Sequence, residues 1–108
     1  MTFDEYQAAA HETAIYPGSI GLAYVTLGLA GEAGEFANKV KKVYRDDIGV
    51  VSDEKRALLM MELGGCLWYL AEACTVLGID LSMVADLNIN QLRSRQERGK
   101  LGGSGDNR

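Results

Sequence analysis

Three glutamates in this sequence are candidates for binding a divalent metal ion. Glu32 and Glu35 lie three residues apart in a segment of helical periodicity, so one helical turn places both carboxylates on the same face. Glu32 also continues the apolar series between Leu29 and Phe36, and a carboxylate on a packing face needs a neutralising cation. Glu62 lies at the edge of the apolar face of another predicted helix. If the two helices pack antiparallel, the three carboxylates converge and offer oxygen ligands of the kind that magnesium prefers.

A simpler interpretation of the same residues also stays open at this point. The spacing ExxE is common in ordinary helices, where exposed glutamates form salt bridges with neighbouring cations. The glycines around the pair favour the metal site, because each interior glycine costs a helix about 1 kcal/mol relative to alanine. Their presence predicts the close approach of another backbone or of a ligand; these glycines are Gly21, Gly28, Gly31 and Gly34.

Four helices are predicted to position these residues. The apolar positions alternate three and four apart, and no segment has the alternation of a strand. Thr2 and Glu5 fit a capping box at the first helix, Ser52 is a suitable N-cap for the third, and Gly78 ends it. The predicted helices span about residues 3–15, 20–44, 53–77 and 81–97. The sequence therefore predicts an all-α, four-helix-bundle-type domain over residues 1–98, followed by a glycine-rich tail over 99–108.

Length and charge restrict the class of partner. A chain of 108 residues supports one domain with a modest core, so we expect the bundle to be completed by pairing with a copy of itself. The net charge of -4 argues against binding to a nucleic-acid polymer. Most basic residues nevertheless fall in two tracts, between 39 and 45 and between 93 and 108. These tracts fit either a small polyanion or two solvated helix ends.

The two cysteines and the hydropathy suggest a location. Cys66 and Cys74 lie in an apolar run without a CxxC pair, so neither a zinc site nor a disulfide framework is expected. No apolar run was expected to reach the roughly 20 residues that span a bilayer, and the acidic start does not fit a signal peptide. We therefore expect a soluble protein of the reducing cytoplasm that does not associate with membranes.

Two segments resemble, in order, the two motifs of MazG-like nucleotide pyrophosphohydrolases, ExxE followed by ExxD. They are residues 27–35, with sequence LGLAGEAGE, and residues 62–70, with sequence ELGGCLWYL. The similarity continues through 79–81, 87–88 and 92–95, and the glycine-rich end resembles short, phage-type members. The resemblance implies an all-α pyrophosphatase fold that assembles as a homodimer or homotetramer. It also implies hydrolysis of a nucleoside triphosphate to the monophosphate and pyrophosphate.

The resemblance implies roles for individual residues. Glu32, Glu35 and Glu62 would be ligands of magnesium, with manganese as an alternative ion. Glu32 and Glu35 are the candidate catalytic residues, and Glu35 is preferred as the general base. Four further residues are candidates to bind the substrate, although a solvated basic helix end stays open for the cations: Lys39, Asn88, Arg93 and Arg95. Trp68 and Tyr69 are expected to pack, and His11 to lie at the surface or at a helix cap.

Two departures from the family pattern leave the activity open. Gly65 stands where the aspartate of ExxD is expected, and Gln91 stands where a lysine is common. A water or another acid such as Asp86 could fill the place of the aspartate, or turnover could be weakened. The sequence thus favours an enzyme, with a nucleotide-binding module as the alternative and a purely structural helical protein as a third hypothesis. Deoxynucleotides and damaged nucleotides are both open as substrates.

Overall fold

A computed structural model describes all 108 residues, which form helices and no strands. The elements are α1 (Phe3–His11), the short 3-10 helix η1 (Gly18–Ile20), α2 (Gly21–Asp47), α3 (Asp53–Leu77) and α4 (Leu81–Glu97). The predicted all-α class is confirmed, and the predicted bounds of the third and fourth helices match α3 and α4. The capping box of Thr2 and Glu5 and the N-cap of Ser52 are both present.

The first two helices differ from the prediction at their ends. α1 ends at His11 and not near residue 15. Just after His11, the Thr13 hydroxyl donates to the Ala10 carbonyl, and the chain then approaches Pro17. α2 continues to Asp47, beyond the predicted end at residue 44. It stops where Ile48 and Gly49 both adopt left-handed backbone conformations, with φ of 55° and 77°.

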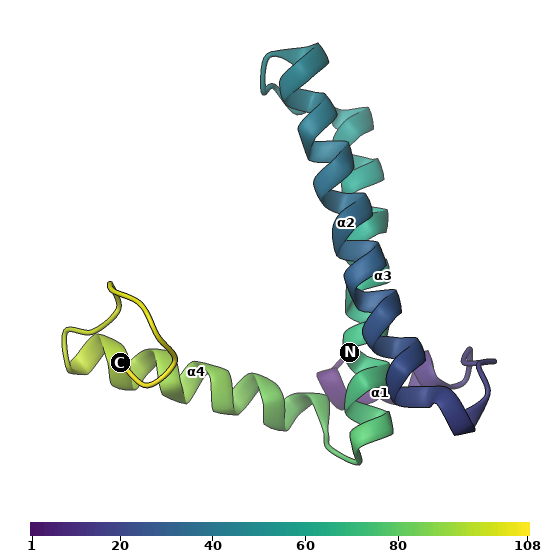
Figure 1. Cartoon of the computed structure of the whole chain (residues 1–108), viewed down its shortest axis with the longest axis vertical. Helices are drawn as coiled ribbons and strands as arrows, with labels where there is room; N and C mark the ends of the chain where they lie inside the picture. Colours follow the sequence, from purple (N-terminus) through teal and green to yellow (C-terminus); the bar gives the residue numbers. More distant parts are fainter.

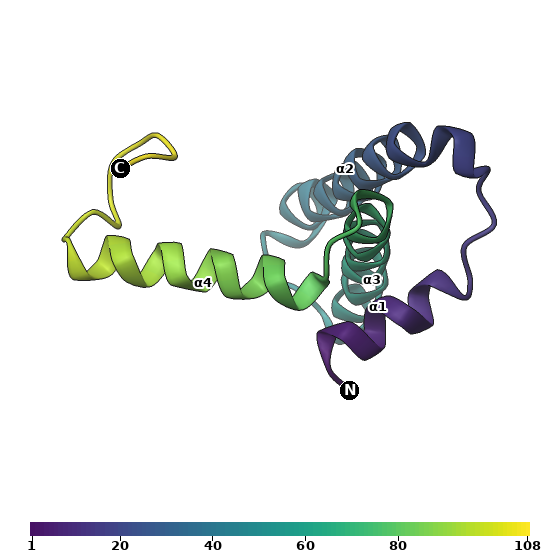
Figure 2. The same ribbon diagram turned by 90° about the horizontal axis from the view of Figure 1, so that it is seen from below.

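The helices form an open, L-shaped molecule. α2 and α3 make a long antiparallel hairpin, α1 packs beside α3, and α4 projects sideways from the hairpin (Figure 1). Figure 2 shows α4 starting beside α1 and α3 and then extending away from the other three helices. The radius of gyration is 16.7 Å, against about 13 Å for a compact domain of this size. Within the chain, α4 contacts α1 near its start and does not run along the α2–α3 hairpin. Completion of the predicted four-helix-bundle-type fold by a second copy therefore stays a prediction.

The buried core lies where α1, α3 and the start of α4 meet. It consists of Ala10, Ala71, Cys74 and Leu81, with Trp68 packed against it. Small side chains at 71 and 74 let α1 approach α3 closely. The apolar face that the sequence predicted for α3 lies elsewhere on the helix and is largely exposed, at Leu63, Leu70 and Leu77.

α3 is long and apolar enough to cross a membrane by the criteria of length and composition, with a mean hydropathy of 1.3. This finding corrects the expectation that no segment approaches a membrane span. The central helix of a helical hairpin satisfies the same criteria, and α3 packs against both α1 and α2. α3 also carries Glu62 and Glu72, whose charged groups are costly in hydrocarbon.

Candidate metal centre

Glu32, Glu35 and Glu62 form a carboxylate cluster in the middle of the α2–α3 hairpin. One carboxylate oxygen from each residue lies within 4.8 Å of the others. The spacing of three in α2 directs Glu32 and Glu35 to the same face, and the antiparallel packing of α3 brings Glu62 opposite them. The convergence expected from the sequence is therefore present in the structure.

Lys39 is the only cation paired with this carboxylate cluster. Its Nζ lies 3.0 Å from Glu62 Oε1, and the Glu62 side chain is only 13% exposed. The Lys39 ammonium holds the pKa of Glu62 below its usual value. By contrast, burial and the neighbouring carboxylates Glu62 and Glu35 raise the pKa of Glu32. One positive charge thus faces three carboxylates, and negative charge accumulates around Glu32.

This arrangement fits a hard divalent cation. The donor set consists of carboxylate oxygens alone, which suits magnesium or manganese and not zinc or copper. Both supporting helices are long and packed against each other, so the ligand positions are fixed by backbone. Burial first, and then the neighbouring carboxylates, raise the pKa of Glu32, and a bound cation would favour its charged form.

Gly65 explains how Glu32 reaches α3. A Cβ added at Gly65 would lie 2.7 Å from Glu32 Oε2 and 2.8 Å from its Cδ, closer than van der Waals contact allows. The carboxylate of Glu32 therefore occupies the space beside position 65, where the family pattern expects an aspartate. At the adjacent Gly64, an added Cβ would meet nothing. The space that a side chain at position 65 would fill is thus occupied by Glu32 from the opposite helix.

An aromatic cluster lies on the hairpin on the α1 side of the carboxylates. Tyr16 stacks on Tyr24 with ring centroids 4.9 Å apart, and Trp68 packs edge-on to Tyr69 at 5.0 Å. Tyr69 lies directly over Gly28, where any Cβ would overlap its ring. Gly28 thus has the close contact that its position in a helix predicted, whereas Gly31 and Gly34 meet nothing within the chain. The Trp68 indole donates to Thr13, which agrees with its predicted packing role.

A buried acid network was not expected from the sequence. Glu72 is fully buried in α3 and accepts hydrogen bonds from the Tyr16 hydroxyl at 2.7 Å and from His11 Nδ1 at 3.2 Å. His11 is exposed, as predicted, and its pairing with Glu72 is the part that the sequence did not indicate. Burial, and then the contact with Glu72, raises the pKa of Tyr16 to about 12. The available signal was a lone carboxylate inside the apolar run from 67 to 77.

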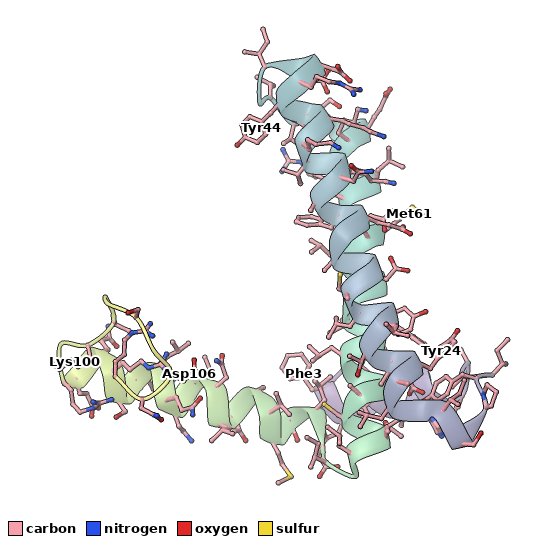
Figure 3. The ribbon with its side chains drawn as sticks, viewed as in Figure 1. Phe3, Tyr24, Tyr44, Met61, Lys100 and Asp106 are labelled. Carbon is pink, nitrogen blue, oxygen red and sulfur yellow. The ribbon has the colours of Figure 1, made fainter.

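The structure does not bring the predicted substrate-binding residues of α4 to the carboxylate cluster. Asn88, Arg93 and Arg95 lie on the projecting helix, as does Asp86 (Figure 1). Arg95 instead donates to the carbonyl of Asp106 at 2.8 Å, in the tail that folds beside α4 (Figure 3). Of the four candidates, only Lys39 contacts the cluster within one chain.

Comparison with known proteins identifies the family. The MazG nucleotide pyrophosphohydrolase domain matches residues 22–99, a range that contains all three glutamates of the cluster. The chain is also 53% identical over 114 positions to "Gene 37 protein" of Mycobacterium phage L5, with 100% of both chains covered. No solved structure matches. A match over more than half of the chain, with both glutamate-bearing helices inside it, means that this protein belongs to the MazG nucleotide pyrophosphohydrolase family.

Proposed function

We propose that the protein hydrolyses a nucleoside triphosphate to the monophosphate and pyrophosphate, with magnesium as its cofactor and manganese as an alternative ion. The observation that carries the proposal is the convergence of Glu32, Glu35 and Glu62 within a matching family domain. Magnesium bound at such carboxylates neutralises phosphate oxygens and stabilises the charge that develops during phosphoryl transfer.

The reaction needs a base and a water beside the bond between the α- and β-phosphates. The water oxygen bonds to one of the two phosphorus atoms flanking the bridging oxygen, and the bond from that phosphorus to the bridging oxygen breaks. The electron pair stays on the departing phosphate group, and a carboxylate accepts the proton of the water. Glu35 suits this role best, because it is the exposed member of the cluster. The Glu32 carboxylate instead lies beside Gly65 of α3, and Glu62 is paired with Lys39.

The active protein is proposed to be a homodimer or homotetramer. A single chain exposes 7800 Å², about 1,900 Å² more than the roughly 5,900 Å² expected for a compact monomer of this mass. Burial of that excess on each of two chains gives about 3,800 Å², within the range of obligate dimers. The exposed faces that a second copy would cover are apolar and lie on α3 and α4, at Leu63, Leu70, Leu77, Met83 and Leu87.

The same assembly offers a route for α4 to reach a carboxylate cluster. Asn88, Arg93 and Arg95 cannot reach the cluster of their own chain, so they are proposed to serve the site of a partner subunit. A deoxynucleoside triphosphate is the proposed substrate class, which is consistent with a full-length relative encoded by a phage. The free thiols Cys66 and Cys74 fit the proposed cytoplasmic location.

A second function, nucleotide binding without turnover, is favoured by one observation. Gly65 supplies no carboxylate where the family pattern has aspartate, so the cluster has three acidic ligands and not four. Glu32 occupies the space beside Gly65, so the three remaining carboxylates stay close together and the enzyme stays the first proposal.

A pyrophosphate-release assay with ribo- and deoxynucleoside triphosphates, with and without magnesium, separates the two functions. We expect release by the parent with magnesium and loss of release in Glu35→Ala. Thermal melts of the parent with nucleotide and magnesium accompany the assay. Magnesium-dependent stabilisation by nucleotide without any release would support the binding module, and the absence of both would refute both functions.

A further inference from the structure

A second charged feature lies beside the carboxylate cluster, towards the turn that joins α2 and α3. It is a cavity of about 220 Å³, here called the lysine pocket, lined by Lys39, Lys42, Val43, Lys55, Leu58 and Leu59. Val43 is 2% exposed, and three lysine side chains share the lining of the pocket with it. The pocket therefore combines three positive charges with an apolar wall that weakens solvent screening.

The register of the two helices fixes this pocket relative to the carboxylate cluster. Lys42 lies seven residues after Glu35 in α2, and Lys55 lies seven residues before Glu62 in α3. Seven residues are about two helical turns, so each lysine lies on the face of its glutamate and about 10 Å further towards the turn. Lys39 lies between them and touches both features, since it lines the pocket and pairs with Glu62.

Two of these three cations have no ion-pair partner in the chain. Lys39 pairs with Glu62, but neither Lys42 nor Lys55 forms a salt bridge. Both lysines help to lower the pKa of Asp46, after Arg45, but its carboxylate already accepts two hydrogen bonds from Arg45. The pocket thus keeps positive charge that is available to an anion.

The order of features along the hairpin matches the chemical order of a nucleoside triphosphate. The aromatic cluster, which includes Tyr24, lies on the α1 side and the carboxylates lie in the middle. The lysines lie towards the α2–α3 turn, on the side of Tyr44 (Figure 3). A metal-binding centre at the α–β bond would leave the β- and γ-phosphates within about one helical turn of it, on the side of the lysine pocket, where Lys39 lines the pocket and also pairs with Glu62.

We propose that the lysine pocket binds the β- and γ-phosphates of the substrate and hence the pyrophosphate product, with Lys42 and Lys55 as binding residues. This inference rests on the proposed function, because it assumes that the carboxylate cluster marks the scissile bond. It adds two hairpin lysines to the groups that neutralise the phosphate tail, whereas in α4 Gln91 stands in place of a family lysine.

The test is calorimetric titration with inorganic pyrophosphate, in magnesium, of the parent and of Lys42→Gln and Lys55→Gln. Lys41→Gln is the matched control, because Lys41 is an exposed neighbour in the same helix that does not line the pocket. Each pocket variant should weaken pyrophosphate binding on the order of tenfold, the effect of losing one charge-assisted contact. The control should bind like the parent, and circular dichroism should show unchanged helix content in all variants.

Titration with a nucleoside monophosphate separates a specific subsite from a general loss of charge. The monophosphate lacks the β- and γ-phosphates, so its affinity should be the same in the parent and in both pocket variants. Equal pyrophosphate binding in parent and pocket variants, or no pyrophosphate binding by the parent, would overturn the proposal that the lysine pocket binds these phosphates. So would a parallel loss of monophosphate binding. Pyrophosphate release from triphosphates by the parent, together with unaffected pocket variants, would leave the proposed function intact.

Discussion

Replacing Gly65 with alanine should separate the stability of α3 from the position of a metal ligand. Alanine in place of an interior helical glycine stabilises a helix by about 0.5–1 kcal/mol. For a domain of this size that corresponds to an increase of about 2–8 °C in the melting temperature. The new Cβ would lie 2.7 Å from Glu32 Oε2, below the 3.4 Å of ordinary contact, so the carboxylate must retreat by about 0.7 Å.

Such a displacement matters more to a metal ion than to the fold. The Glu32 carboxylate is the end of a flexible side chain, so it can move without disturbing the α2–α3 packing. Magnesium, however, demands ligand distances near 2.0–2.1 Å, and a functional site tolerates about 0.2 Å of error. We therefore expect Gly65→Ala to melt at a higher temperature than the parent without metal, and to bind magnesium at least about tenfold more weakly.

Gly64→Ala is the matched control for this experiment. It makes the same change one residue earlier in α3, where the added Cβ meets nothing. It should gain the same metal-free stability and keep the magnesium affinity of the parent, both measured by thermal melts in chelator and by magnesium titration. Equal magnesium affinity in the two alanine variants would refute the role of Gly65. In a Glu32→Gln background, Gly65→Ala should have no further effect on metal binding.

Three further predictions concern stability and assembly. Tyr16→Phe should lower the free energy of unfolding at neutral pH by about 1–3 kcal/mol, because buried Glu72 loses a donor. The folded pKa of Tyr16 is raised from 10.0 to about 12, so its stabilisation is complete below pH 10 and is lost as the pH rises towards 12; urea unfolding across this range should show a fall in the parent that Tyr16→Phe lacks. Gly28→Ala should destabilise by about 1–3 kcal/mol in thermal melts because its Cβ overlaps Tyr69, whereas Gly31→Ala should not. Sedimentation should give a multiple of the chain mass and dilution should lower the melting temperature; a monomer that melts at one temperature across all concentrations would contradict the proposed assembly.

The bounds of α3 and α4 could be predicted because their signals are local. Ser52 accepts from the Lys55 backbone at the start of α3, and Gly78 ends it in a left-handed conformation with φ of 71°. Both features depend on the residue type at one position and on neighbours within four residues. The end of α1 was missed because the Thr13 hydroxyl bonds the Ala10 carbonyl, a local competitor that apolar periodicity does not reveal.

The carboxylate cluster could also be predicted, because periodicity alone places each glutamate on a face. Once Glu32 and Glu35 share one face of α2 and Glu62 borders the apolar face of α3, antiparallel packing brings them together. Their use as metal ligands stays a prediction, as do the assigned domain limits of 1–98 and 99–108.

The sequence by itself determined the helical class, the ends of α3 and α4, and the helix faces that carry the acids. These properties follow from backbone hydrogen bonding and side-chain spacing within a few residues. Only the tertiary structure decided that His11 and Tyr16 pair with Glu72, across 61 and 56 residues, and that Gly65 makes room for Glu32. It also decided that α4 points away from its own hairpin. Such contacts depend on the volumes and charges that meet between distant segments, and periodicity within one helix does not specify which distant face it will meet.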